Sequence, residues 1–193
     1  YRQGYGRQHV DSQGIQSETY PEFDPEEFLE DTGIEIVLRL DGGDLYSRIW
    51  KRTVSGVSGS SVDVLFLDTL HAKNSNEHVA LGKRLYGGDD SVRIRQEFLL
   101  GVGGTRALKA LGVWPLKGVH LNEGHCAFAA LELLAQGWSR EQLKSQSLFT
   151  THTPVPAGHD RFSWQEMNDV LGELLPDDAQ ELAGQENASM SHL

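Results

Sequence analysis

Residues 117–152 read KGVHLNEGHCAFAALELLAQGWSREQLKSQSLFTTH, and this stretch decides the fold class. Residues 117–121 have the pattern of a short strand, residues 124–136 have the spacing of a helix, and residues 146–151 give a second strand. Strands that alternate with helices indicate βαβ units and a parallel sheet. An amphipathic helix is predicted over residues 162–175. The sequence therefore predicts an α/β fold for the second half of the chain.

The first half of the chain predicts antiparallel β structure. Residues 34–40 alternate enough for a strand, residues 41–44 (DGGD) favour a turn, and residues 45–54 form the returning strand of a hairpin. Residues 62–67 add a third, largely buried strand. Residues 1–30 are rich in Gly, Gln, Asp, Glu and Pro, and they predict an irregular surface loop. We expect the strands to form an insertion or edge sheet on the parallel core.

A long helix is predicted over residues 91–110, with Ser91 as its N-cap. Its apolar residues fall near one face at helical spacing, and they are Ile94, Phe98, Val102, Leu108 and Leu111. Three glycines also lie inside it, namely Gly101, Gly103 and Gly104. Because each glycine in a helix interior costs roughly 1 kcal/mol relative to alanine, we expect another backbone or a ligand to approach the helix closely there.

The composition is acidic and moderately polar. The 193 residues include 17 basic and 28 acidic side chains, and the formal net charge is −11 at pH 7. Such a charge argues against a nucleic-acid or anionic-membrane partner. The single Cys126 cannot form an internal disulfide, and no apolar run approaches the roughly 20 residues that span a bilayer, so a cytoplasmic location is expected. Neither a P-loop nor a Gly-x-Ser-x-Gly nucleophile motif occurs.

Two polar clusters follow the predicted strands of the second half. The first is HLNEGH at residues 120–125, where a strand leads into a helix, and the second is TTHTPVP at residues 150–156. In open parallel α/β sheets, ligands bind at the carboxyl ends of the strands. The clusters combine histidine, amide, hydroxyl and carboxylate groups. These groups suit a neutral sugar, which is bound through many hydrogen bonds and few net charges.

A structural interpretation of the same clusters stays open. Asn122 and Glu123 could cap the following helix, since a helix N-terminus favours anions and side-chain acceptors. A histidine at a strand end is often a structural residue. Residues 120–125 lack the His-Glu-x-x-His arrangement, which argues against a zinc site. Two matching clusters at neighbouring strand ends favour a ligand site over a purely structural one.

Seven stretches, in order, resemble the bacterial α-glucan (glycogen/maltodextrin) phosphorylases. They are YRQGYGRQ (1–8) with ETY (18–20), LDT (67–69), RLYGGD (84–89), RIRQEFLLG (93–101), RALKALG (106–112), HLNEGH (120–125) and FTTHTPVPAG (149–158). The resemblance covers residues 1 to about 180, nearly the whole chain. A single stretch would be weak, whereas seven in the same order are specific.

The resemblance implies a partial Rossmann-like N-terminal lobe of a two-lobed GT-B glycosyltransferase. Residues 1–70 would be its loop and antiparallel strands, and residues 91–193 its α/β part. The C-terminal lobe would be absent, so the chain is expected to be a fragment that is inactive alone. Pyridoxal 5′-phosphate would be held by a lysine of that other lobe, because none of the six lysines here lies in a matching context. No cofactor-binding or metal-binding residue is assigned within the chain.

By resemblance, the parent enzyme transfers a terminal α-1,4-linked glucosyl unit to inorganic phosphate and releases α-glucose 1-phosphate with retention. His152 matches a catalytic, substrate-binding histidine that contacts the glucosyl residue. Asp89 and Asp90 match a gate loop that closes over the substrate. Asn122, Glu123 and His125 match a polar segment that lines the same cleft and supports binding. The implied partners are an α-1,4-glucan and phosphate, and a homo-oligomer is compatible with the resemblance.

Two other functions remain open at this point. The chain could be a non-catalytic lobe that binds glucan or docks on a partner. It could also belong to a GT-B glycosyltransferase that uses a sugar nucleotide, although nothing in the sequence resembles a nucleotide-diphosphate contact. Reading the gene past Leu193 separates the first alternative from an enzyme, because an enzyme needs the lobe with the cofactor lysine.

Overall fold

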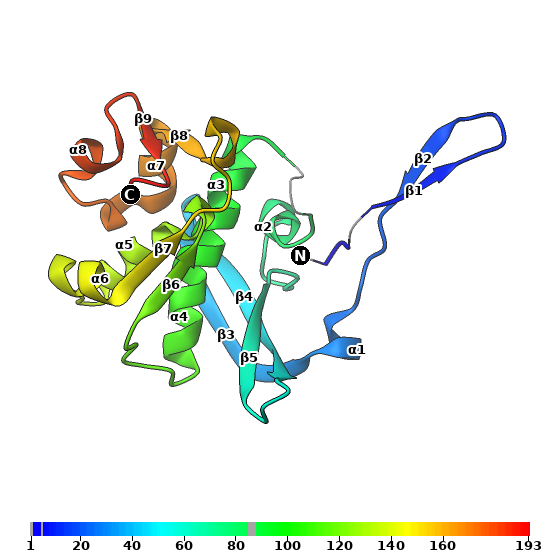
Figure 1. Ribbon diagram of the computed structural model, residues 1–193, viewed down its shortest axis with the longest axis horizontal. Helices are drawn as coiled ribbons and strands as arrows, with labels where there is room; N and C mark the ends of the chain where they lie inside the picture. Colours follow the sequence, from blue (N-terminus) through cyan, green and yellow to red (C-terminus); the bar gives the residue numbers. More distant parts are fainter. Residues whose placement is uncertain (1, 5, 85–87) are drawn as a thin grey trace. The chain divides into compact units, whose positions relative to one another are not determined.

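The computed structural model describes residues 2–4, 6–84 and 88–193. The chain divides into two compact units, of which the first holds residues 1–35 and 46–87 and the second holds residues 36–45 and 88–193. Among the described residues there are one three-stranded sheet and three two-stranded sheets. The protein therefore has a mixed α/β fold (Figure 1).

The first unit begins with structure that the sequence did not predict. Strands β1 (Arg7–Val10) and β2 (Gln16–Thr19) form an antiparallel ribbon, and α1 (Pro25–Phe28) is a single helical turn. The side chain of Asp11 accepts hydrogen bonds from the backbone N–H groups of Gln13 and Ile15, at 2.8 and 2.9 Å, and this stabilises the ribbon's turn. The prediction of an irregular loop over residues 1–30 was therefore wrong for these segments.

The predicted hairpin and third strand are present, but the third strand is not largely buried as predicted, because residues 61–64 are exposed and only its last residue, Asp68, is buried. Strands β3 (Glu30–Leu40), β4 (Gly43–Ser55) and β5 (Ser61–Asp68) form one sheet in that order, and β4 and β5 are antiparallel. The β3–β4 turn has positive φ angles at both Asp41 (52°) and Gly42 (72°), as an Asp-Gly hairpin turn requires. The short helix α2 (Asn76–Leu81) follows, with Ser75 as its N-cap.

A continuous helix opens the second unit (Figure 1). It consists of α3 (Asp90–Phe98), a π-helical segment (Leu99–Gly103) and α4 (Gly104–Ala110). The N-cap is Asp89 and not the predicted Ser91, because the Asp89 carboxylate accepts the Val92 N–H at 3.2 Å. Ile94, Phe98 and Val102 are buried as predicted.

The π-helical segment explains why the predicted apolar face is not buried along the whole length of the helix. Beyond it the buried residues are Thr105 and Ala107, whereas Leu108 and Leu111 are only partly buried. The wider turn of the π-helix shifts the phase of the helix, so the buried face is not the one that a constant helical spacing predicts. Gly101 confirms the expected close approach, since a Cβ there would lie 2.7 Å from the Ala129 nitrogen.

The predicted βαβ unit is present. Strand β6 (Val119–Asn122) leads through a 3-10 turn (Gly124–Cys126) into α5 (Phe128–Ala135) and α6 (Arg140–Gln146), and the chain returns in β7 (Ser147–Thr150). Strands β6 and β7 are parallel and lie side by side (Figure 1). Their carboxyl ends therefore lie at the same edge.

The last part of the second unit packs around α7 (Trp164–Leu171). The remaining elements are a 3-10 turn (Pro156–Gly158), β8 (Arg161–Ser163), a 3-10 turn (Gly172–Leu174), α8 (Ala179–Ala183) and β9 (Asn187–Ser189). The helix predicted over residues 162–175 is thus shorter, because residues 161–163 form a strand with β9 and Ser163 caps α7 through a capping box.

Candidate functional site

The parallel pairing of β6 and β7 brings the two polar clusters together. Asn122 lies opposite Thr150 in the register, and the Glu123 N–H donates to the Thr150 carbonyl at 2.8 Å. Residues 122–123 and 150–152 therefore leave the sheet next to each other. This position, at the carboxyl ends of neighbouring parallel strands, is where open α/β sheets bind ligands.

Glu123 holds the second cluster to the first. Its carboxylate accepts the His152 N–H at 2.5 Å and the Thr151 hydroxyl at 2.9 Å. The His152 N–H is the largest cause that lowers the pKa of Glu123, and the Thr151 hydroxyl and the charges of His152 and His125 act in the same direction. Because both histidines act on one carboxylate, both lie near Glu123.

The backbone of Glu123 is strained. Its φ of 64° and ψ of 171° lie in a region that is populated almost only by glycine. Such a conformation costs about 1–3 kcal/mol and persists only where the surroundings hold it. Here the hydrogen bonds to Thr151 and His152 keep the side chain directed at the second cluster.

His152 is exposed, and its ring is oriented by Asn122. The Nε2 atom lies 3.1 Å from Oδ1 of Asn122. With the amide oxygen as acceptor, Nε2 of His152 is the donor of this hydrogen bond. The imidazole is thus held at the edge of the sheet, where it can form hydrogen bonds with hydroxyl groups.

His125 lies on the partly buried side of the cluster. Burial is the main cause that lowers its pKa, and the charge of Arg93 lowers it further, while Asp160 and Glu123 oppose this. We therefore expect His125 to be neutral at pH 7. A neutral histidine can bind a sugar hydroxyl as donor or acceptor.

Asp89 and Asp90 are not joined to this network. No described contact connects either aspartate with His152, Asn122 or Glu123. Asp89 caps α3, and the Val92 N–H is the main cause that lowers its pKa. Asp89 therefore serves as the N-cap of α3. Tyr86 and Gly87, which precede Asp89 in the stretch RLYGGD (84–89), lie outside the described residues.

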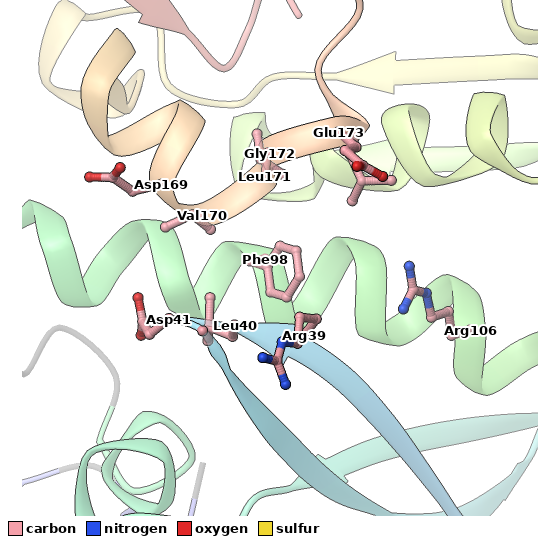
Figure 2. A pocket seen from close by; sticks show the side chains of 12 residues that line it. Arg39, Leu40, Asp41, Phe98, Arg106, Asp169, Val170, Leu171, Gly172 and Glu173 are labelled. Carbon is pink, nitrogen blue, oxygen red and sulfur yellow. The ribbon is translucent and has the colours of Figure 1, made fainter.

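A cavity elsewhere in the same unit does not include any of these residues. It has a volume of about 470 Å³ and is shown in Figure 2. It lies between the β3–β4 turn, the long helix and the end of α7. Its charged lining is largely paired: Arg106 holds Glu132 at 2.8 and 3.0 Å, and Asp41 holds Arg95 at 2.6 and 2.8 Å.

Comparison with known proteins finds relatives that match most of this chain. Maltodextrin phosphorylase of Thermococcus litoralis is 35% identical over 91% of this chain and 22% of that protein. Glycogen phosphorylase of Mycobacterium tuberculosis is 37% identical over 91% of this chain and 23% of that protein. The chain is homologous to a segment of the glycogen and maltodextrin phosphorylases. This confirms the resemblance seen in the sequence.

The homology has a limited extent. Glycogen phosphorylase of Aquifex aeolicus is 31% identical over 80% of this chain and 24% of that protein. The chain thus spans less than a quarter of the length of each of these three relatives. No protein-family model matches the chain.

Two further properties were tested in the described part of the chain. None of its helices is long and apolar enough to cross a membrane. Within residues 2–4, 6–84 and 88–193, no group of three or more His, Cys, Asp or Glu side chains is arranged to hold a metal ion.

Sequence reasoning missed a second group of polar residues in this unit. Arg93, Glu97 and Asp160 meet beside His125. The signal was present, because Arg93 and Glu97 are spaced i, i+4 among apolar residues of the predicted helix. Nothing in the sequence placed Asp160 beside them, since it follows 63 residues after Glu97.

Proposed function

We propose that this chain is part of an α-glucan phosphorylase. Such an enzyme transfers a terminal α-1,4-linked glucosyl unit of glycogen or maltodextrin to inorganic phosphate and releases α-glucose 1-phosphate with retention. The homology over 91% of the chain supports the assignment. The chain would form part of a Rossmann-like N-terminal lobe in a two-lobed GT-B enzyme, and the residues at the ends of β6 and β7 would face the cleft.

The observation that carries this proposal is the network of His152, Asn122, Glu123 and Thr151. It sets histidine, amide and hydroxyl groups at the carboxyl ends of two parallel strands, with one carboxylate that is already satisfied by two hydrogen bonds. A neutral ligand rich in hydroxyl groups matches these side chains. The carboxylate of the network is occupied by its two hydrogen bonds, so the network offers hydrogen bonds rather than charge.

In the proposed reaction, the bond between C1 of the glucosyl unit and the glycosidic oxygen breaks, and a bond between C1 and a phosphate oxygen forms. The proton of the phosphate passes to the departing oxygen. His152 would bind a hydroxyl of the glucosyl ring. A contact that strengthens as the ring flattens toward an oxocarbenium-like transition state lowers the barrier. Asn122 and Glu123 would orient His152, and His125 would line the same cleft.

Pyridoxal 5′-phosphate does not fit the lysines of this chain. A Schiff-base lysine is normally buried so that it can lose its proton. Here Lys51 pairs with Glu30 at 3.3 Å and Lys73 is 61% exposed. The other four are exposed, namely Lys83, Lys109, Lys117 and Lys144. The proposal therefore assigns the cofactor to a C-terminal lobe outside this chain, and expects the chain alone to bind glucan without catalysis.

Asp89 and Asp90 would belong to a loop that closes over the substrate. Closure would exclude water and favour phosphorolysis over hydrolysis. The capping bond of Asp89 to Val92 fixes one end of this loop to α3, so a movement of the loop would pivot at the start of the helix.

The experiment that tests the proposal is kinetic. In the full-length protein, His152→Ala should lower kcat/KM for phosphorolysis of a maltooligosaccharide at least ~10-fold, since each decade corresponds to about 1.4 kcal/mol of transition-state binding. The exposed His9 on β1 provides the matched control, and His9→Ala should leave the rate unchanged. Equal rates for both variants would remove His152 from the site. A wild-type protein that forms no α-glucose 1-phosphate would contradict the proposed function itself.

A further inference from the structure

A buried glutamate in the second unit is not used by the proposed function. Glu97 lies in the last turn of α3, directly before the π-helical segment, and is 2% exposed. Neither oxygen of its carboxyl group has a hydrogen-bond partner in good geometry among the described residues. Such groups are rare in native proteins, because nothing compensates their loss of water. A π-helical segment is itself frequent at functional sites.

One guanidinium group lies between two carboxyl groups here. The Nε atom of Arg93 is 2.9 Å from Oε1 of Glu97, and its Nη2 atom is 3.1 Å from Oδ2 of Asp160. With both acids ionised, one positive charge would face two negative charges, of which the one on Glu97 is buried and the one on Asp160 is partly exposed. A proton on Glu97 removes the excess charge and makes Glu97 a hydrogen-bond donor to Asp160.

The surroundings of Glu97 favour that proton. The pKa of Glu97 is raised to about 9, mainly by burial and next by Asp160. The positive charge of Arg93 lowers this pKa but does not outweigh the other two causes. Cys126, from the 3-10 turn after β6, also lies close enough for Glu97 to raise the pKa of its thiol, after the larger effect of burial. The groups that face Glu97 thus come from its own helix, from the segment before β8 and from the turn that carries His125.

Asp160 stands at the end of the loop that begins with His152. At the beginning of this loop, Glu123 accepts the His152 N–H at 2.5 Å. At its end, Asp160 is held by Arg93, and its carbonyl accepts the Met190 N–H at 3.1 Å. The loop of residues 152–160 is therefore anchored at both ends, by an ionised glutamate at the start and by the Arg93–Glu97 pair at the finish.

We propose that Glu97 is a positioning residue, whose protonated carboxyl group donates to Asp160 and so fixes the far end of the loop that carries His152. Glu97 does not touch the substrate and acts through Asp160. The link from this loop to glucan binding rests on the proposed function, whereas the protonation of Glu97 and the order of the loop do not.

The first test is infrared spectroscopy of the full-length protein. At pH 7 the wild type should show a carbonyl band of a protonated carboxylic acid that is absent from Glu97→Gln. The band should disappear as the pH rises through about 9. Glu132→Gln is the matched control, because Glu132 is equally buried but is held by both nitrogens of the Arg106 fork, and the band should persist in it. A wild-type spectrum without the band at pH 7 would overturn the proposal.

The second test compares Glu97→Gln, which keeps a neutral donor, with Glu97→Met, which has none. Amide hydrogen exchange of residues 152–160 should rise in the Met variant and stay at the wild-type level in the Gln variant. For phosphorolysis, the Met variant should raise KM for maltooligosaccharide at least ~5-fold with kcat within about 2-fold, as expected for one lost hydrogen bond. The Gln variant should restore the wild-type KM.

Each outcome decides a separate point. The positioning role would be overturned if amide hydrogen exchange of residues 152–160 in the Met variant stayed at the wild-type level. It would also be overturned if this exchange rose in the Gln variant while the circular dichroism of that variant was unchanged. If both spectroscopic readouts follow the prediction but the wild type forms no α-glucose 1-phosphate, the proposed function fails and the role of Glu97 in the loop stands.

Discussion

Two glutamates near the candidate site have pKa values that are shifted in opposite directions. Glu123 accepts hydrogen bonds from the His152 N–H and the Thr151 hydroxyl, which lower its pKa and keep it ionised. Glu97 is buried next to Asp160, which raises its pKa to about 9. The first acts as an acceptor and the second as a donor, although the side chains are the same. Environment alone assigns the two roles.

The raised pKa of Glu97 predicts a pH-dependent stability. Between about pH 4.5, where the carboxyl titrates in the unfolded chain, and about pH 9 in the folded one, only the folded state holds the proton. The free energy of unfolding therefore falls as the pH rises through this window, by up to ~1.4 kcal/mol per pH unit. The glutamine of Glu97→Gln does not titrate. The thermal midpoint of this variant should therefore rise relative to that of the wild type between pH 5 and pH 9. A difference in midpoint that stays constant over this range would contradict the account.

The site residues differ in how far the sequence predicts them. His152 and Asn122 were predictable, because a strand pattern ends just before each, and the parallel pairing then brings the ends together. The strained backbone of Glu123 was not, since its φ and ψ depend on contacts with a strand 28 residues away. Asp160 and Glu97 meet only through the tertiary fold, which local spacing does not encode.

At the scale of elements, the sequence predicted an element correctly where the residues that determine it are neighbours in the sequence. The Asp41-Gly42 turn and the alternating strand before it predicted the hairpin. The predicted N-cap of the long helix was wrong by two residues. Both Asp89 and Ser91 are residue types that cap helices well, and in the structure the helix begins after Asp89. The π-helical segment was not predictable, because its wider turn serves the packing against α5.

Two of the three glycines of the long helix, Gly101 and Gly104, give a matched pair for testing that packing. A Cβ at Gly101 would lie 2.7 Å from the Ala129 nitrogen and 2.9 Å from the Phe128 carbonyl carbon, whereas nothing lies within 4 Å of a Cβ at Gly104. Gly101→Ala should therefore destabilise the protein by about 1–3 kcal/mol, the usual cost of overpacking. Gly104→Ala has helical φ and ψ and should stabilise it by about 0.5–1 kcal/mol.

Thermal unfolding of the two variants checks this prediction. The midpoint should fall for Gly101→Ala and rise slightly for Gly104→Ala. The same direction of change for both would show that helix α5 does not approach the π-helical segment as closely as the structure has it.

At the scale of the whole molecule, the parallel sheet of β6 and β7 has two strands in the described part of the chain. Leu148 is 60% exposed and Phe149 is 41% exposed on β7. Parallel sheets are normally covered on both faces. This exposure is consistent with a chain that spans less than a quarter of each of the three phosphorylases named above. The α/β class was predictable from the sequence, because strand and helix patterns alternate within its second half.

The central claim is that the carboxyl ends of β6 and β7 form one wall of a glucosyl-binding crevice. The most direct measurement is a crystal structure of the full-length protein with bound α-glucose 1-phosphate. The account predicts a glucosyl ring at these strand ends, with one of its hydroxyl groups within about 3.2 Å of a ring nitrogen of His152. A sugar bound elsewhere, with no contact to His152, Asn122 or His125, would contradict it.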